Sequence, residues 1–161
     1  MGSGKSTLGK KLAQLLEMPF YDLDEYIEHQ ENKSISDLFA SEGEAAFREK
    51  ETKYLKQLLF DESGIVIALG GGTVCFNSML EFAKLNGILI YISLPVSALV
   101  QRLSSKKNSR PLLKDLNESQ LQEFVTNLLN NREVYYKQAH LKINGINLRP
   151  EHLINEIKSL L

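Results

Sequence analysis

A glycine-rich stretch opens the chain, Gly2-Ser3-Gly4-Lys5-Ser6-Thr7, and leads directly into a predicted helix. Small residues at a helix start let backbone N–H groups and the positive end of the helix dipole converge on phosphate oxygens. Lys5 offers a positive charge to the β- and γ-phosphates, and the Ser6 hydroxyl can ligate Mg²⁺. These residues match the second half of the G-x-x-x-x-G-K-[ST] loop, so we expect a nucleoside triphosphate site here rather than a plain glycine-rich turn.

Two acids, Asp22 and Asp24, alternate at the end of a short predicted strand over residues 20–24. Side chains at the carboxyl ends of parallel strands face the crevice in which α/β sheets bind ligands. One carboxylate could bind in the coordination shell of a metal ion while the other orients a substrate hydroxyl. The alternative is that they are solvated loop acids, or that Asp24 caps the following helix.

Two arginines lie on predicted apolar helix faces. Arg48 follows Phe47, with Glu51 three residues later. Arg132 falls on one helical face with four less polar residues, namely Leu121, Val125, Leu128 and Tyr135. Either arginine could pair with an internal carboxylate, Glu51 being the nearest candidate for Arg48. Beside a phosphate loop, however, two inward arginines suit a substrate carboxylate, which they can bind in a bidentate manner.

A glycine triplet, Gly70-Gly71-Gly72, ends a predicted strand, where the missing side chains would let a ligand touch the backbone. Arg110 ends a polar segment over residues 104–110, so it could enter the site when a lid closes, or it could be an ordinary surface arginine. Cys75 is interpreted as a small buried hydrophobe. The three histidines lack metal-ligand spacing.

The hydrophobic pattern predicts alternating helices and strands. Strands are expected at residues 20–24, 64–69, 87–92 and 140–144, and helices at 5–17, 77–86, 95–104, 118–138 and 150–161, with further helical segments up to about residue 60. The continuous apolar runs at 64–69 and 87–92 predict strands buried on both faces. We therefore expect a three-layer α/β/α sandwich with a parallel sheet.

The composition favours a single domain over residues 1–161, because 161 residues with 43% hydrophobic content can bury one core of moderate size. Lys plus Arg number 19 against 20 for Asp plus Glu, and the net charge of -1 offers no field for binding nucleic acid or an anionic membrane. The chain shows no membrane span and no signal segment, and its one cysteine cannot form an internal disulfide. We expect a cytoplasmic monomer with a small-molecule partner.

The ordered motifs together resemble the shikimate kinase family over nearly the whole chain. Besides the phosphate loop they are Asp22-x-Asp24, Gly43-Glu44-x-x-Phe47-Arg48, Gly70-Gly71-Gly72, Arg110-Pro111-Leu112-Leu113 and Arg132-x-x-Tyr135-Tyr136. The resemblance implies a P-loop kinase fold like that of nucleoside monophosphate kinases, with a five-stranded parallel sheet and a lid at about residues 104–116. It also implies transfer of the γ-phosphoryl group of ATP to the 3-hydroxyl of shikimate, on the route to chorismate and the aromatic amino acids.

The resemblance also implies roles for individual residues. Asp24 would meet the reacting hydroxyl, and Lys5 and Arg110 would neutralise phosphoryl charge, which makes these three the expected catalytic residues. The substrate carboxylate would bind Arg48 and Arg132, with Gly71 giving a backbone contact within the glycine triplet. Ser6 would hold Mg²⁺ with Asp22 in its outer shell. The nucleotide would contact the loop from Gly2 to Thr7 and three arginines, Arg102, Arg110 and, by a weaker match, Arg149.

The family pattern places a strand and the first glycine of the loop before Met1. Without that strand, the strands on either side of its place in the sheet would have unpaired backbone groups. We expect those neighbouring strands among residues 20–24, 64–69 and 87–92. Two other functions share part of the pattern: another small-metabolite P-loop kinase, for gluconate or a nucleoside monophosphate, and a non-enzymatic nucleotide switch. The switch is disfavoured, because the D-x-x-G match at Asp61 precedes its strand and the Asn32-Lys33 run lacks the acid that reads guanine.

Overall fold

The structure is a computed structural model that describes residues 2–105, 113 and 115–160. Helices and strands alternate along the chain, as the hydrophobic pattern predicts. In chain order they are α1 (Lys5–Leu16), β1 (Phe20–Asp22), α2 (Leu23–Glu31), α3 (Ile35–Asp61), β2 (Val66–Ala68), the 3₁₀ helix η1 (Thr73–Cys75), α4 (Met79–Asn86), β3 (Ile90–Ser93), α5 (Val96–Ser104), α6 (Glu118–Tyr136), β4 (Leu141–Asn144) and α7 (Pro150–Lys158).

The strands form two separate parallel pairs within the described residues. β1 pairs with β2, with Phe20 opposite Val66, and β3 pairs with β4, with Ile90 opposite Leu141. No described strand joins one pair to the other. The prediction that the two apolar strands are buried on both faces is wrong: every residue of β3 is half-buried. The physical reason is that no further strand among the described residues pairs with β2 or β3, so each of these strands has a strand neighbour on one edge only.

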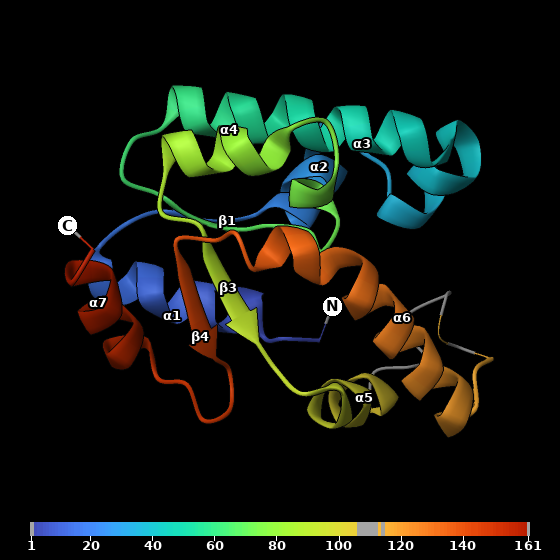
Figure 1. Cartoon of the computed structure of the whole chain (residues 1–161). Helices are drawn as coiled ribbons and strands as arrows, with labels where there is room; N and C mark the ends of the chain where they lie inside the picture. The colour runs from blue at the N-terminus through green and yellow to red at the C-terminus, as the bar shows by residue number, and fades with distance from the viewer. Residues whose placement is uncertain (1, 106–112, 114, 161) are drawn as a thin grey trace.

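Helices cover the strands on two sides. Figure 1 shows α2, α3 and α4 on one side of the strands, and α1 and α7 on the other. Helix α1 packs on β1 and β2 and also on α7, and α7 in turn packs on β4. The pair α1 and α7 therefore spans both strand pairs, in agreement with the expected α/β/α sandwich.

Two separate hydrophobic clusters stabilise the two ends of the molecule. The first joins α2 to α3 and α4, and its buried members are Leu23, Ile27, Leu38, Phe47, Tyr54, Leu55, Leu58 and Met79. The second joins α5 to α6, with Leu94, Leu99, Val100, Leu103, Leu113, Leu121 and Val125 buried. Arg48 comes directly after a member of the first cluster, and Arg132 lies two turns beyond a member of the second. Each cluster thus anchors one of the two arginines.

Two local predictions need correction. The strand expected over residues 20–24 ends at Asp22, because the Asp22 carboxylate accepts a hydrogen bond from the Asp24 N–H and starts helix α2. Asp24 is therefore a helix residue, and Asp22 rather than Asp24 is the N-cap. Tyr135 was expected on the inward face of α6, yet its side chain is 36% exposed. The inward residue is Tyr136, four positions after Arg132, which is the closer match to helical periodicity.

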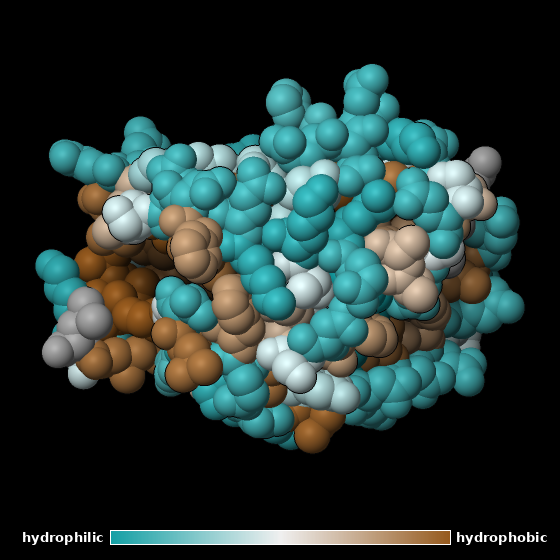
Figure 2. Space-filling view, turned by 90° about the horizontal axis from the view of Figure 1, so that it is seen from above, coloured by the Kyte–Doolittle hydropathy of each residue, from teal (hydrophilic) through white to brown (hydrophobic). Residues whose placement is uncertain are grey.

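A hydrophobic hollow opens at one end of the molecule. Figure 2 shows it at the left, the side on which the C-terminus lies in Figure 1. Apolar side chains are visible deep inside this hollow, so part of the space between the layers is not covered by the described residues. No described helix is long and apolar enough to cross a lipid bilayer.

We predict that an added strand stabilises this fold. A chain extended upstream of Met1 by roughly ten residues of strand-forming sequence should melt at a higher temperature, because β1–β2 and β3–β4 are separate pairs among the described residues. A strand that joins them would add backbone hydrogen bonds worth about 0.5 to 1.5 kcal/mol each, against a domain stability of about 5 to 15 kcal/mol. Thermal melts of the two chains measure the difference. The control is an extension of equal length rich in glycine and serine; equal melting temperatures for all three chains would contradict the prediction.

Candidate active site

The phosphate loop precedes α1 with its backbone held open. Gly4 is the N-cap of α1 with a φ of 87°, in the left-handed region that glycine enters without strain, and no side chain caps this helix start. The first N–H groups of α1 are therefore left for an anion. The chain folds in this way because Lys5 to Leu16 carry an apolar face, ending in buried Leu12 and Ala13, that packs the helix on the strands.

A cavity of about 610 Å³ lies against this loop. The whole loop from Gly2 to Thr7 lines it, together with Asp24, Gly71, Arg102 and Arg132. These residues come from α1, α2, α5, α6 and the segment after β2, so the fold gathers distant parts of the chain around one space. The cavity thus brings together the phosphate loop, one of the expected acids and two of the expected arginines.

Asp22 lies at the centre of the contacts below the loop. Its side chain is 6% exposed, and it accepts a hydrogen bond from the Ser6 hydroxyl. The Lys5 ammonium nitrogen lies 3.7 Å from the same carboxylate oxygen. The strand end of β1 and the first turn of α1 are therefore linked by one carboxylate.

The oxygens of Ser6 and Asp22 fit a magnesium ion. Mg²⁺ prefers oxygen ligands and retains several waters, so one hydroxyl and one outer carboxylate are sufficient beside the phosphates of a nucleotide. Within the described residues there is no cluster of three or more His, Cys, Asp or Glu side chains that would indicate an all-protein metal cage. The donor set therefore suits a cation that arrives with the nucleotide.

Asp24 lies in the first turn of α2, partly buried at the cavity wall. Burial raises the pKa of its carboxyl above the usual value; Lys5 acts in the opposite direction, and the negative charges of Asp22 and Glu51 add to the rise. A raised pKa makes a carboxylate a stronger acceptor for a proton. Asp24 is thus the described acid that is best suited to receive a proton from a hydroxyl in this cavity.

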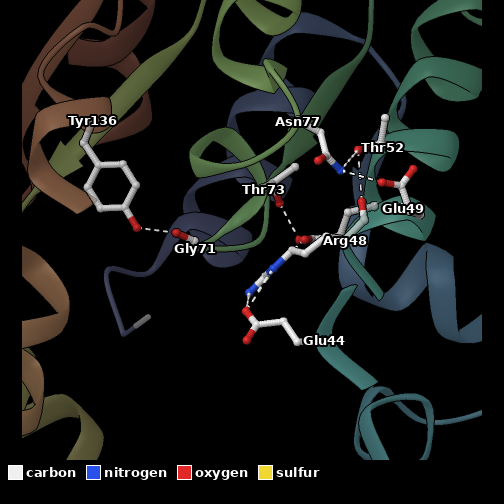
Figure 3. Close-up of polar contacts among 9 residues, drawn as sticks. Glu44, Arg48, Glu49, Thr52, Gly71, Thr73, Asn77 and Tyr136 are labelled. Carbon is white, nitrogen blue, oxygen red and sulfur yellow. Dashed lines mark hydrogen bonds and ion pairs between the residues drawn. The ribbon is translucent and has the colours of Figure 1, made fainter. Parts of the chain in front are cut away.

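Arg48 is held by two carboxylates. Its Nη1 donates to Glu51 at 2.5 Å, and its Nη2 donates to Glu44 at 2.9 Å. Figure 3 shows the contact between Arg48 and Glu44, with Thr73 near Arg48. Glu51 is 2% exposed and accepts a second hydrogen bond, at 2.6 Å, from Thr73 Oγ1. The internal pairing that the sequence left open for Arg48 is therefore present in the structure.

Aromatic rings and hydrogen bonds fix the Arg48 guanidinium. Its Cζ lies 4.6 Å from the ring centre of Phe76 and 5.4 Å from that of Phe47, within the range of a cation–π contact. Burial alone would lower the pKa of Arg48, but the hydrogen bonds and charges of Glu51 and Glu44 raise it. Arg48 is thus a fixed cation with most of its charge already balanced.

The glycine triplet accommodates these charged side chains. A Cβ atom at Gly70 would lie 2.7 Å from Glu51 Oε1, and one at Gly72 would lie 2.7 Å from Arg48 Nη1. Both distances are shorter than real carbon contacts allow, so a side chain at either position would displace the cluster. The triplet was interpreted as making room for a ligand; at Gly70 and Gly72 the space is occupied by the chain's own side chains, and Gly71 alone of the three lines the cavity.

Arg132 differs from Arg48 in having no carboxylate partner within 4.0 Å in the described part of the chain. It lies on α6, half-buried, with its side chain at the cavity. Tyr136 lies one turn further on and donates its hydroxyl to the carbonyl of Gly71 (Figure 3). Helix α6 therefore brings to the cavity, beside Gly71, a cation that has no carboxylate partner among the described residues.

The remaining expected arginines have different positions. Arg102 lines the cavity and donates from Nη1 to the Ser3 carbonyl at 3.0 Å, so it braces the phosphate loop. Arg149 is exposed and does not line the cavity, although Leu148 and Pro150 beside it do. Arg110 lies outside the described residues, as does most of the segment expected to form the lid.

Cys75 is half-buried rather than fully buried, and burial raises the pKa of its thiol.

Three other residues of the site have only weak signals in the sequence. Glu51 appeared only as a possible partner of Arg48, Tyr136 only as the last residue of a motif, and Thr73 not at all. Their spacing from Arg48 and Arg132 could have identified the first two; Thr73 depends on a contact across 22 positions, for which the sequence holds no local signal.

Comparison with known proteins gives one consistent result. The family model described as shikimate kinase matches residues 1–161. A shikimate kinase of Azobacteroides pseudotrichonymphae is 40% identical over 141 residues, which cover 88% of this chain and 83% of the relative. One of Parabacteroides distasonis is 36% identical over 161 residues, covering 100% of this chain and 92% of the relative.

Solved structures agree with the sequence relatives. The crystal structure of shikimate kinase from Bacteroides thetaiotaomicron has a TM-score of 0.92 at 35% identity and covers 99% of this chain and 93% of its own. Shikimate kinase from Acinetobacter baumannii, solved in complex with shikimate, has a TM-score of 0.85 at 36% identity, with 99% and 87% covered. The phosphate loop, the paired and unpaired arginines and these full-length matches agree, and the chain belongs to the shikimate kinase family.

Proposed function

We propose that the cavity between the phosphate loop and Arg132 is where this shikimate kinase transfers the γ-phosphoryl group of ATP to the 3-hydroxyl of shikimate. The observation that carries the proposal is the common lining of one cavity by the phosphate loop, Asp24, Gly71 and Arg132. One space would thereby combine a phosphate site, a proton acceptor and a carboxylate site. The reaction belongs to aromatic amino-acid biosynthesis.

The nucleotide half of the site would use backbone donors and fixed cations. The loop from Gly2 to Thr7 would cradle the phosphates with its N–H groups, and Lys5 would lie against the β- and γ-phosphates. Arg102 would support the loop through Ser3 and flank the adenine. Arg149 is a weaker candidate for nucleotide contact, and the proposed role of Arg110 in neutralising phosphoryl charge rests on the family resemblance alone.

Ser6 and Asp22 would hold Mg²⁺, Ser6 through its hydroxyl and Asp22 from the outer shell. When bound, Mg²⁺ supplies charge neutralisation between the β- and γ-phosphates. The Ser6 hydroxyl would turn a lone pair of its oxygen toward the cation while its proton stays in the hydrogen bond to Asp22. Asp22 would thus orient the Ser6 hydroxyl toward the cation. Lys5 lies close enough to Asp22 to offset part of the negative charge of its carboxylate.

Asp24 would orient the shikimate hydroxyl and accept its proton. Phosphoryl transfer depends mainly on positioning and charge stabilisation, so the proton is needed late in the reaction. The partly buried carboxylate has a raised pKa, which favours its taking the proton once the new bond to phosphorus forms. Asp24, Lys5 and Arg110 are the proposed catalytic residues.

The substrate carboxylate would bind between Arg132 and Arg48. Arg132 has no carboxylate partner among the described residues, whereas Arg48 has two, so Arg132 would supply most of the uncompensated charge. Gly71 would add a backbone contact between them, with Gly70 and Gly72 giving Arg48 the space it needs. The arrangement favours a substrate with one carboxylate and one reactive hydroxyl.

We further propose that the enzyme acts as a cytoplasmic monomer. The phosphate loop, Asp24, Gly71 and Arg132 of one copy line the same cavity, so each proposed step would use groups of a single chain. Cytoplasmic location is supported by the need for ATP as co-substrate and by the single unpaired cysteine.

A coupled assay of ADP release tests the function directly. We expect ADP release that depends on both Mg²⁺ and shikimate, with no comparable rate on gluconate or a nucleoside monophosphate. Release that is rapid on either of those compounds and absent on shikimate would overturn the proposal.

We predict that the two arginine variants differ. Arg132→Ala should raise the KM for shikimate far more than the KM for ATP, since loss of a bidentate partner for a buried carboxylate costs roughly 2 to 5 kcal/mol. Arg48→Ala should raise the same KM and also lower the melting temperature, because buried Glu51 loses its cation. Steady-state kinetics and thermal melts separate the cases. Equal loss of ATP and shikimate binding in both variants would indicate that the two arginines support the fold and do not bind the substrate.

We predict a large loss of turnover in Asp24→Asn. The amide keeps the shape of the side chain but cannot take the proton, so kcat should fall by roughly two to four orders of magnitude with little change in folding. The matched control is Glu25→Gln, which neutralises the next acid on α2; Glu25 pairs with Lys10 at 3.9 Å and does not line the cavity. Near-normal kcat in Asp24→Asn would remove Asp24 from the reaction.

A further inference from the structure

Tyr136 is the last residue of α6 and lies one helical turn after Arg132. Residues four apart share one face of a helix, so the phenol ring and the guanidinium lie next to each other. Tyr136 is half-buried, and the ring of Tyr91 on β3 packs on it at 5.1 Å between centroids, with 36° between the ring planes. The tyrosine ring is thus held by packing on Tyr91, independently of its hydroxyl.

The hydroxyl makes a specific contact across 65 positions of the chain, donating to the carbonyl oxygen of Gly71. Figure 3 shows this bond reaching from the end of α6 to the glycine segment, on the side away from the Arg48 cluster. Gly71 lines the cavity, and η1, which follows the triplet, also packs on α6. The bond therefore connects the helix that carries Arg132 to the glycine backbone that lines the same cavity.

The bond also determines where neighbouring N–H groups point. The Gly71 carbonyl and the Gly72 N–H belong to one planar trans peptide and point in opposite directions. Neither the Gly71 nor the Gly72 N–H donates to an acceptor within the described part of the chain. With no side chain at either residue, this peptide could rotate easily if its carbonyl were free.

We propose that Tyr136 is a positioning residue for the acceptor substrate. Its hydroxyl holds the Gly71 carbonyl, and thereby fixes both the direction of the Gly72 N–H and the distance from the glycine segment to Arg132. The inference rests on the proposed function, in which Arg132 and this backbone receive the substrate carboxylate. Tyr136 itself touches neither the nucleotide nor the reacting hydroxyl in this role.

The test is Tyr136→Phe, which removes the hydroxyl and keeps the ring that packs on Tyr91. We expect the KM for shikimate to rise roughly 3- to 10-fold, as for the loss of one neutral hydrogen bond, while the KM for ATP stays within twofold. The matched control is Tyr135→Phe, the same change at the neighbouring, more exposed tyrosine; it should leave both KM values unchanged. Calorimetric titration of shikimate without nucleotide should show the same difference between the variants.

A second measurement does not depend on activity. In ¹⁵N-glycine-labelled chain, Tyr136→Phe should shift the Gly72 amide resonance and speed its hydrogen exchange, whereas Tyr135→Phe should not. An unchanged shikimate KM and unchanged glycine resonances in Tyr136→Phe would overturn the inference. So would an equal rise in both KM values with a large drop in melting temperature, since that result indicates a structural role only.

Arg132→Ala distinguishes this inference from the function on which it rests. If Arg132→Ala weakens shikimate binding and Tyr136→Phe does not, the positioning role is wrong and the function stands. If the unaltered chain does not turn over shikimate, the proposed function itself is wrong.

Discussion

Glu51 is a carboxylate with almost no contact with water, and the arrangement of the acceptor site depends on it. It binds Arg48 on one oxygen and Thr73 on the other, so it joins α3 to the segment that follows β2. A buried carboxylate is costly unless it is paired and hydrogen-bonded, and here both conditions are met. Because the pair is internal, Arg48 keeps its orientation whether or not a ligand is present.

The same constraint explains why the two arginines are not equivalent. Arg48 belongs to a cluster that carries two carboxylates, so the cluster as a whole offers no net positive charge to an incoming anion. Arg132 extends from a helix anchored by a different hydrophobic cluster, with no such compensation in the described residues. In the proposed site, rigid geometry would thus come from one arginine and attractive charge from the other.

The sequence predicts the elements well and the contacts between them less well. Phosphate-loop chemistry and helical periodicity are local, so the loop, α1, α6 and the site arginines follow from residue spacing. The start of α2 at Leu23 required knowing that Asp22 would use its own side chain as a cap. Tyr136, and not Tyr135, points inward. The two differ by a single position along the helix, and a short apolar stripe in the sequence does not distinguish them.

The separation of the strands into two pairs and the Glu51–Thr73 contact lie beyond local reasoning, because both depend on tertiary pairing. The family resemblance led to the expectation of unpaired backbone groups among residues 20–24, 64–69 and 87–92, which stays a prediction. In the structure, β2 and β3 lie in separate two-stranded sheets. Their half-buried faces then follow, because a strand's burial depends on its neighbours as much as on its own residues.

The close approach of Gly70 and Gly72 to charged side chains bears on how this enzyme can change over generations. Any other residue at Gly72 would put a carbon atom onto the Arg48 guanidinium, and any other residue at Gly70 would meet Glu51. A shorter side chain in place of Arg48 would make room but leave the Glu51 carboxylate buried without its cation. A single substitution is therefore unfavourable whether it changes a glycine or the arginine. The two glycines and the Arg48–Glu51 ion pair can be replaced only together.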